Sequence, residues 1–297
     1  MSMKILITGA SGQIGSYTIE HFADKHEVIG VDLKPFRFGD LKDLIMQGDL
    51  RDYRLVEKIV KDVDVVIHLA AQVSVENSWK DPIYDAESNI IVTINLLKAC
   101  SEHGISKFVY ISSAAVYGNP IYVPIDEEHP KNPMSPYGVS KLTGEYYCKI
   151  FSNSINVSIL RPFNVFSARM DPNNPYSGVI AKFISRAKKG LPLIIFGDGK
   201  QTRDFVHVKD VVRAIELVLK RGKNGEAYNV GTGKEITILE LAEMIMEISG
   251  LKGNIIFDKP RKGDIRRSCA DITRIKKLGF IPKTNLRKDL EEVYEEL

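Results

Sequence analysis

The sequence predicts an α/β fold built on a doubly wound parallel sheet, with a smaller cap in the last third of the chain. Two observations lead to this prediction. Short apolar runs alternate with helical patterns through the first two thirds of the 297 residues, as is typical of repeated strand–helix units. From Ser167 onward this rhythm changes, and no flexible linker separates the two parts. We therefore expect the two parts to pack tightly together.

Five strands are expected, each short and largely apolar, as parallel strands buried on both faces are. They lie at Lys4–Thr8, Glu27–Asp32, Val63–Leu69, Lys107–Ser112 and Val157–Arg161. Helical patterns lie between them, at Ile14–Ala23, Tyr53–Lys61, Ile90–His103 and Tyr137–Asn153. We assign residues 1–165 to the sheet domain and expect ligands to bind at the carboxyl ends of its strands.

The last third reads as a cap of shorter elements. Ser167–Gly178 is rich in proline and asparagine and is expected to be a loop. A helix, a strand and two further helices should follow, at Val179–Lys189, Leu193–Phe196, Val211–Lys220 and Ile238–Ser249. Residues 166–297 would then form mainly a substrate-binding cap, with a return of the chain to the sheet domain within about 204–232.

Composition excludes several classes of protein. A net charge of +3 is too small to indicate a nucleic-acid or membrane partner. Three cysteines, odd in number and far apart, suggest neither a disulfide framework nor a metal cluster, so we expect no metal and a reducing compartment. No apolar run is long enough for a transmembrane helix, and the first strand begins without a signal-peptide pattern. The cytoplasm is the expected location.

A glycine-rich segment joins the first expected strand to the first helix. It reads Thr8-Gly9-Ala10-Ser11-Gly12-Gln13-Ile14-Gly15. Glycines three apart would allow a tight turn, a close approach to a diphosphate, and close packing of helix on strand. The helix start, with Gln13 and Ile14, would offer free N–H groups to the phosphates. The simpler alternative is a plain strand–helix turn, but the position at the first strand favours a Rossmann-type dinucleotide site.

Asp32 ends the second expected strand, 20 residues after Gly12. A carboxylate at that place accepts hydrogen bonds from the adenosine ribose hydroxyls. It also repels a 2′-phosphate, which favours NAD over NADP. Lys34 and Arg37 lie nearby and could weaken this preference, and the alternative role for Asp32 is that of a solvated turn residue.

Tyr137 and Lys141 begin a helix after Pro136 and share one of its faces because they are four residues apart. A tyrosine acting as a base near pH 7 needs its pKa lowered by about three units, roughly 4 kcal/mol. A nearby ammonium group and a cationic nicotinamide could supply this.

Ser112 and Ser113 end the fourth expected strand. A hydroxyl at that place could form a hydrogen bond with a substrate oxygen, and the alternative is a serine that caps a turn.

Together these segments resemble the extended short-chain dehydrogenase/reductase family, in its nucleotide-sugar epimerase/dehydratase branch. The resemblance spans nearly the whole chain. Beyond the glycine loop and Tyr137–Lys141 it rests on the segments GDL (48–50), HLAA (68–71), Asn89, SSAAVYG (112–118), RPFN (161–164), GDGKQTRDF (197–205), YNVG (228–231) and RKGD (261–264). So many ordered matches are very improbable by chance.

The resemblance implies a role for each matching residue. Tyr137 would be the acid/base, with Lys141 as its modulator and nicotinamide-ribose ligand, and Ser113 would hold the sugar O4. Further cofactor contacts would come from Gly9, Gly12, Gln13, Ile14, Gly15, Asp32, Asp49, Leu50, Leu69, Ala70, Ala71 and Asn89. The substrate would be bound by Asn164, Arg203 and Arg261 at its diphosphate, by Asp264 at its ribose and by Ser268 near the sugar C2 group.

The resemblance implies NAD-dependent 4-epimerisation of a UDP-hexose, by transient oxidation at C4 and return of the hydride to the opposite face. Ala114 and Ala115 stand where related dehydratases carry acidic residues, which argues against elimination of water. Pro162 replaces an aromatic found in many epimerases, and the cap is short. The alternatives are a nucleotide-sugar reductase or oxidase that releases NAD(P)H, and a non-catalytic dinucleotide sensor. Threonine dehydrogenases share the GQIG motif but lack a segment that resembles residues 197–205, so they rank low among the alternatives.

The same resemblance implies a homodimer through a four-helix interface. Two helical patterns, Ile90–His103 and Tyr137–Asn153, would supply it. They carry enough apolar positions to face more than one neighbour, namely Ile94, Leu97, Tyr146, Tyr147 and Ile150. The alternative is that all of these side chains lie in the internal core.

Overall fold

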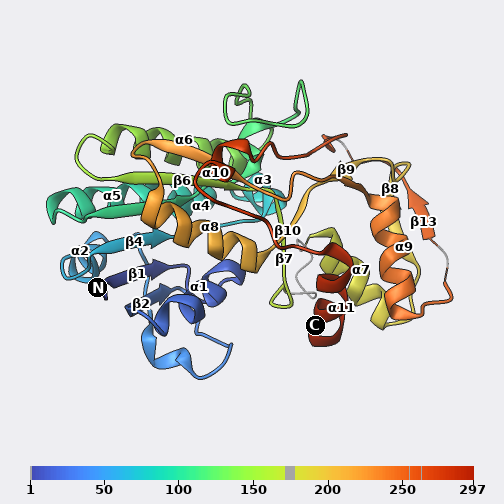
Figure 1. Ribbon diagram of the computed structural model, residues 1–297, viewed down its shortest axis with the longest axis horizontal. Helices are drawn as coiled ribbons and strands as arrows, with labels where there is room; N and C mark the ends of the chain where they lie inside the picture. Colours follow the sequence, from blue (N-terminus) through green and yellow to red (C-terminus); the bar gives the residue numbers. More distant parts are fainter. Residues whose placement is uncertain (1, 171–177, 254, 262) are drawn as a thin grey trace.

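A seven-stranded parallel sheet forms the centre of the computed structural model, which describes residues 2–170, 178–253, 255–261 and 263–297 (Figure 1). The strands are ordered β11-β6-β5-β4-β1-β2-β3. Their bounds are β1 (Lys4–Thr8), β2 (Glu27–Asp32), β3 (Ile45–Gln47), β4 (Val65–His68), β5 (Lys107–Ile111), β6 (Val157–Pro162) and β11 (Glu226–Val230). This order reverses between β1 and β4, which is the topological switch point of a doubly wound fold.

Helices cover both faces of the sheet, so the predicted fold class is confirmed. One face packs against α1 (Gln13–Ala23) and α8 (Val208–Arg221), the other against α2 (Tyr53–Val60), α5 (Val92–Glu102) and α6 (Pro136–Phe151). Each interface is an apolar core. The central strands β1, β4, β5 and β6 are almost wholly buried, which explains why their sequences are continuous apolar runs rather than alternating ones.

Two strands of the sheet were absent from the sequence prediction. β3 has only three residues, none of them fully buried, so it carries no apolar run to detect. β11 pairs with β6, from which residues 163–225 separate it in the chain. The predicted helix Ile90–His103 also differs, because a π-helical turn (Glu87–Ile91) precedes α5. Two short helices, α3 (Val75–Lys80) and α4 (Pro82–Ala86), come before that turn.

The cap lies beside the sheet and has its own apolar core (Figure 1). Its helices are α7 (Val179–Lys188), α9 (Ile238–Ser249) and α11 (Leu286–Glu296), and its paired strands are β8 (Leu193–Phe196) with β13 (Ile255–Asp258) and β9 (Thr202–Arg203) with β12 (Ile236–Thr237). β7 (Asn164–Phe166) pairs with β10 (Phe205–His207) at the junction, and α10 (Thr273–Lys276) packs near β11. Most of the predicted loop Ser167–Gly178, residues 171–177, lies outside the described residues. No helix in the described part of the chain is both long and apolar enough to cross a bilayer.

Candidate active site

The predicted cofactor residues lie in segments that follow successive strands of the sheet. The glycine loop follows β1, Asp32 ends β2, the Asp49–Leu50 segment follows β3, and the Leu69–Ala71 segment follows β4. Because all of these strands are parallel, their carboxyl ends meet at one edge. The structure thus brings together residues that are far apart in sequence, on the edge where this class of sheet binds ligands.

The glycine loop is packed too closely for side chains. Gly9 has φ +69°, and a Cβ atom there would lie 2.6 Å from the Ala70 backbone nitrogen. A Cβ on Gly15 would lie 2.0 Å from the Gly9 carbonyl oxygen. Gly12 is the N-cap of α1 and provides no side-chain cap, so the N–H groups of the first helical turn remain available to an anion. Gln13 adds a buried Nε2 that has no hydrogen-bond partner in the described structure.

Asp32 bonds to the same loop. Its carboxylate accepts hydrogen bonds from the Ser11 backbone N–H at 2.9 Å and from the Lys34 backbone N–H at 2.9 Å. Asp49, by contrast, forms an ion pair with Arg51 at 2.7 Å, and hydrogen bonds from Arg51 hold the pKa of its carboxyl below the usual range. The neighbouring Leu50 is buried in the sheet core.

The segment after β4 is attached to β1 through one hydroxyl. Thr8 Oγ1 accepts hydrogen bonds from the backbone N–H groups of Leu69 and Ala70, at 3.2 and 3.1 Å. Asn89 lies behind this segment: its Oδ1 accepts from the Gln72 N–H at 2.8 Å. Since its amide is fully engaged and only 1% of the residue is exposed, Asn89 supports the wall of the site from within.

Ser113, Tyr137 and Lys141 meet at the carboxyl end of β5. Tyr137 lies in the first turn of α6, whose start is set by the Ser135 N-cap and by Pro136. Burial raises the pKa of Tyr137, while a hydrogen bond with the Ser113 side chain lowers it. Ser112, the other candidate, instead donates to Glu145 at 2.6 Å in the buried interior. Ser113 Oγ also accepts a hydrogen bond from the Ala115 N–H at 3.1 Å, so this serine caps a turn, as the alternative interpretation of the sequence expected.

Lys141 lies one helical turn beyond Tyr137 and is 4% exposed. Its Nζ donates a hydrogen bond to the Ile111 carbonyl at 2.9 Å and lies 5.3 Å from the centre of the Tyr110 ring. Burial lowers the pKa of Lys141 to about 8, against nearby carboxylates that raise it. The ammonium group is thus held at the carboxyl end of β5, and Lys141 has a pKa at which small changes in local charge alter its protonation.

The predicted substrate residues gather on the cap side. Arg203, on β9, forms an ion pair with Asp264 at 2.5 Å, and burial lowers the pKa of its guanidinium. Arg261 lies 3.9 Å above the Phe196 ring. The side-chain amide of Asn164 donates to the Asp204 carbonyl at 3.2 Å, at the junction of cap and sheet. Arg203 and Asp264, expected to contact different parts of one ligand, are therefore bonded to each other in this structure.

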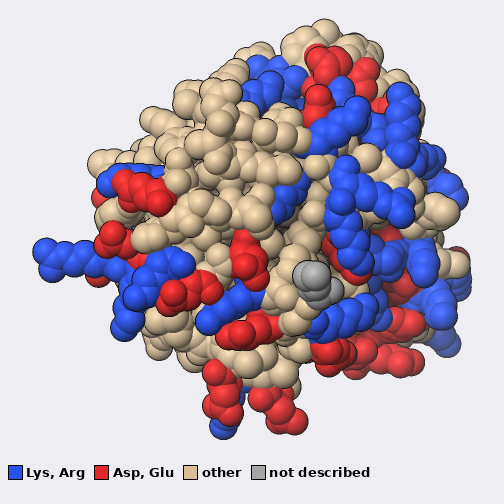
Figure 2. Space-filling model, turned by 60° about the vertical axis from the view of Figure 1, so that its left-hand side comes forward, with Lys and Arg blue, Asp and Glu red and all other residues tan. Residues whose placement is uncertain are grey.

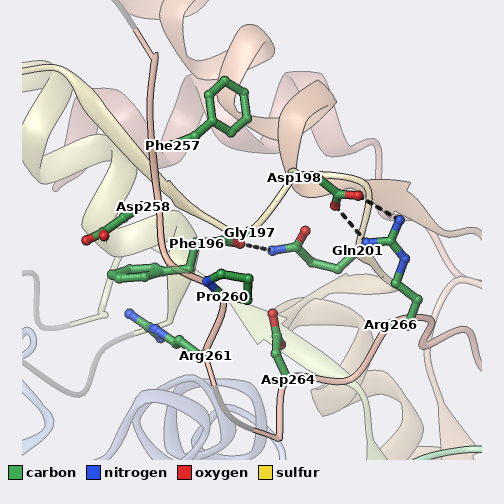
Figure 3. A pocket seen from close by; sticks show the side chains of 10 residues that line it. All are labelled: Phe196, Gly197, Asp198, Gln201, Phe257, Asp258, Pro260, Arg261, Asp264 and Arg266. Carbon is green, nitrogen blue, oxygen red and sulfur yellow. Dashed lines mark hydrogen bonds and ion pairs between the residues drawn. The ribbon is translucent and has the colours of Figure 1, made fainter.

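A cavity of about 670 Å³ is lined by two of these residues, Arg261 and Asp264, while Arg203 and Asn164 are not part of its lining (Figure 3). Phe196 and Arg261 form part of one wall, and an ion pair between Asp198 and Arg266 lies at another side. The lining includes two aromatic rings, three carboxylates and two guanidinium groups. The rings suit a flat polar ring, and the guanidinium groups suit an anion joined to it. The lining comprises Phe196, Gly197, Asp198, Gln201, Phe257, Asp258, Pro260, Arg261, Asp264 and Arg266.

Ser268 follows this cavity in the chain and is 8% exposed. It stands between Arg266, whose carbonyl accepts from the Thr202 N–H at 3.0 Å, and Cys269, whose carbonyl accepts from the Ile125 N–H at 2.8 Å. Backbone bonds on both sides therefore hold the segment that carries Ser268.

Three residues near the site were not among the predicted site residues: Gln72, Asp85 and Phe196. Gln72 and Asp85 bond to Asn89. The only signal for Asp85 was its position four residues before Asn89, one turn along a helix. Phe196 was predicted as a strand residue, and only the pairing of β13 with β8 shows that Phe196 lines a cavity.

Comparison with known proteins agrees with this arrangement. Residues 5–231 match the model of the NAD dependent epimerase/dehydratase family. A putative UDP-glucose 4-epimerase of Methanocaldococcus jannaschii is 43% identical, over 97% of this chain and 96% of its own. The crystal structure of a Thermotoga maritima UDP-glucose 4-epimerase with UDP-glucose has a TM-score of 0.94 and 36% identity, covering 99% and 98% of the two chains.

A third similar protein differs in the sugar that its name gives. It is the UDP-N-acetylglucosamine 4-epimerase of Methanobrevibacter ruminantium in complex with UDP-N-acetylmuramic acid. It is 34% identical with a TM-score of 0.93, over 99% of this chain and 98% of its own. The sheet order, the glycine loop, the buried Ser113–Tyr137–Lys141 group and these similarities lead to one conclusion: the chain belongs to the NAD-dependent epimerase/dehydratase family.

Proposed function

We propose that this protein is an NAD-dependent UDP-hexose 4-epimerase that interconverts UDP-glucose and UDP-galactose. One observation carries the proposal: Ser113, Tyr137 and Lys141 are brought together, largely buried, at the sheet edge that also carries the glycine loop. Ala114 and Ala115, beside Ser113, offer no acid or base for a dehydration. The similar proteins named UDP-glucose 4-epimerase support the same activity.

The residues present fit NAD. Gly12 at the start of α1 leaves N–H groups for a diphosphate, and the unpartnered Gln13 amide lies in the same turn. Asp32 presents its carboxylate at the end of β2 for the ribose hydroxyls. The chemistry that NAD supplies when bound is the reversible acceptance of a hydride at a positively charged ring. Lys141 would hold the nicotinamide ribose.

Tyr137 would take the proton of the sugar 4-hydroxyl as C4 is oxidised and return a proton to O4 when the keto group is reduced. Ser113 would hold O4 throughout, since its hydroxyl already bonds with Tyr137. The positive charge of Lys141 favours the tyrosinate. Because one tyrosine acts first as a base and then as an acid, it must release its proton as readily as it takes one.

The nucleotide would be anchored at a distance from the reacting carbon. The cavity beside Phe196 and Arg261 would take the uridine, while Asn164 and Arg203 would bind the diphosphate and Asp264 the ribose. An arriving diphosphate would compete with Asp264 for the Arg203 guanidinium, which bonds that carboxylate in its absence. Because the binding energy would come from contacts with the nucleotide, the 4-keto sugar is free to rotate and present its opposite face to the cofactor, as inversion at C4 requires.

Incubation with a panel of nucleotide sugars, with C4 epimers resolved by chromatography, tests the proposal. We expect interconversion of UDP-glucose and UDP-galactose without added cofactor, because an epimerase regenerates its NAD in each turnover. Net formation of NADH with a released 4-keto product would instead identify an oxidase or reductase. Binding of NAD without any conversion would identify a dinucleotide sensor.

We also propose a homodimer formed through α5 and α6. Tyr146 and Ile150 on α6 are 56% and 64% exposed, and Ile91 at the start of α5 is 45% exposed. Figure 2, in which the left-hand side of Figure 1 has come forward, shows an area with few charged side chains at its upper left. Leu97 was counted among the apolar positions that could face a second neighbour. It is fully buried in the core of its own chain, because it lies on the side of α5 that packs on the sheet.

The division of the chain that we propose is a sheet domain of residues 1–165 and a cap formed mainly by residues 166–297. Within 204–232 the chain returns to the sheet through β10, α8 and β11.

For the cellular compartment we propose the cytoplasm, since all three cysteines are buried free thiols.

A further inference from the structure

A buried carboxylate lies near Tyr137 and Lys141 without a role in the steps above. Asp85, on α4, is only 1% exposed. Its Oδ1 accepts hydrogen bonds from Gln72 Nε2 at 2.9 Å and from Asn89 Nδ2 at 3.1 Å. Both donors are neutral amides, and no basic group among the described residues forms an ion pair with Asp85. Its negative charge is therefore solvated by dipoles but not neutralised by a direct partner.

Most other titratable groups that surround Lys141 carry no net charge near neutral pH. Burial lowers the pKa of His68, on β4, to about 3, so its imidazole is neutral. Burial also raises the pKa values of Tyr110 and Cys148 well above their ordinary ranges. Tyr137 keeps its proton for the same reason. None of these four groups supplies a charge to balance the Lys141 ammonium.

The remaining carboxylate near Lys141 is already neutralised. Glu145, on α6, receives two hydrogen bonds from the Arg161 guanidinium, at 2.8 and 2.6 Å, inside the core. This bidentate pair cancels most of the field of Glu145 at a distance. Asp85 thus remains as the unpaired negative charge among the described groups that act on Lys141, and it acts on Tyr137 as well.

A chain of hydrogen bonds connects Asp85 to the backbone of Tyr137. Asn89 Nδ2, which donates to Asp85, also donates to Ser140 Oγ at 3.0 Å. Ser140 Oγ donates in turn to the Tyr137 carbonyl at 2.9 Å. Asn89 lies in the π-helical turn before α5, and such turns are frequent at functional sites because they redirect side chains. Asp85 therefore has a defined position relative to α6.

We propose that Asp85 is a positioning residue whose buried negative charge keeps protons on the Tyr137–Lys141 pair. The inference deepens the proposed epimerase function and rests on it. An anion raises the affinity of every neighbouring group for protons, so it keeps Lys141 an ammonium despite burial and prevents Tyr137 from remaining a tyrosinate. A tyrosine that must return its proton to O4 in the second half of the reaction requires this balance.

The test is an absorbance titration of the tyrosinate in the NAD-bound protein, with the Tyr137→Phe spectrum in the same background subtracted. Asp85→Asn removes the charge and keeps the shape. Since removal of an anion lowers the pKa of both members of the pair, we expect the apparent pKa of Tyr137 to fall by about one unit. An unchanged apparent pKa would overturn the proposal.

Asp81→Asn is the matched control. Asp81 is exposed, caps the same helix by accepting from the Tyr84 N–H at 2.9 Å, and is four residues from Asp85. Asparagine preserves the cap, so this variant makes the same charge change outside the core and should leave the titration where it is. An equal shift in both variants would mean that overall charge, and not Asp85, sets the pKa.

Activity provides a second readout. Both limbs of the pH profile of kcat should move to lower pH in Asp85→Asn; a lower kcat with unmoved limbs would reduce Asp85 to a structural residue. If the asparagine variant does not fold, Asp85→Ser leaves room for water and is titrated in the same way. The titration needs no substrate, so a protein that fails to epimerise any sugar would contradict the proposed function while the role of Asp85 is still decided.

Discussion

Two opposed influences act on the Tyr137 hydroxyl. Burial raises its pKa, and the hydrogen bond with Ser113 lowers it. Without a further positive charge the balance favours the protonated phenol, so the tyrosine is ready to act as an acid but not as a base. The nearby Lys141 ammonium, with its pKa of about 8, and the nicotinamide charge must together supply the difference.

Tyr137→Phe should lower kcat by about three orders of magnitude, since a positioned acid/base contributes 10²–10⁴-fold. Affinities for NAD and UDP-glucose should be nearly unchanged because the ring still fills its place. Steady-state kinetics and calorimetric titration measure the two effects separately. Tyr146→Phe, an exposed tyrosine of the same helix, is the control and should keep full activity. More than a few per cent of the original kcat in Tyr137→Phe would assign the proton transfer to another group.

Asp32 should determine the choice between NAD and NADP. Its carboxylate repels a 2′-phosphate, while Lys34 and Arg37 lie in the following turn. Asp32→Ala should weaken NAD binding about tenfold, because the ribose loses an acceptor and the Ser11 N–H loses its partner. The difference in affinity between NAD and NADP should therefore become smaller. Titration of the apo-protein with both cofactors measures this. Tighter NADP than NAD binding by the unmodified protein would contradict the role of Asp32.

Ser268 should admit sugars with an acetamido group at C2. A small side chain leaves space that a tyrosine would fill, and the backbone bonds on both sides of Ser268 limit how far the segment can move aside. Ser268→Tyr should therefore reduce turnover of UDP-N-acetylglucosamine at least tenfold more than that of UDP-glucose. Rates on the two substrates, measured side by side, provide the comparison. Equal losses, or no activity of the unmodified protein on N-acetylated sugars, would exclude this role.

At the scale of elements, the N-terminus of α6 carries the proposed acid/base residue. Ser135 caps it by accepting from the Gly138 N–H at 3.1 Å, and Tyr137 is the second residue of the helix. Ser135→Ala should cost about 1 kcal/mol of stability and lower Tm by about 2 °C. It should also lower kcat several-fold, because the fraying turn carries the acid/base residue.

Thr237→Ala provides the matched comparison, by calorimetry and kinetics. Thr237 caps α9 in the cap by accepting from the Glu240 N–H at 3.1 Å, with the reciprocal bond from its own N–H to Glu240 at 2.8 Å. Its loss should lower Tm to a similar degree and leave kcat nearly unchanged. A fall of kcat in both variants would mean that overall stability, and not the position of Tyr137, limits the rate.

At the scale of the whole molecule, the exposed apolar side chains of α6 indicate a partner. Tyr146 and Ile150 are four residues apart and form one stripe. Replacing both by glutamate should convert a dimer into a monomer at micromolar concentration, because it places like charges opposite each other across a two-fold interface. Light scattering of the unmodified and the doubly substituted protein measures this. A monomeric mass for the unmodified protein would rule the dimer out.

The sequence by itself determined the central strands of the sheet and predicted which residues lie at its ligand-binding edge. β1, β2, β5 and β6 lie within a residue of their predicted bounds, because strands buried on both faces are read directly as apolar runs. The glycine loop and the Tyr137–Lys141 pair were also predicted from the sequence, because each is a pattern of local spacing. The glycines are three positions apart, and the tyrosine and lysine are separated by one helical turn.

Only the tertiary structure decided features that depend on contacts between distant segments. It placed Ser113 beside Tyr137 and turned Ser112 toward Glu145, paired β11 with β6, and buried Leu97 where the pattern allowed a partner. It also put Asp85 near Lys141, where no basic group of the described residues forms an ion pair with it. The electrostatic effect of a buried charge depends on every group around it, and those groups come from strands and helices that lie apart in the sequence.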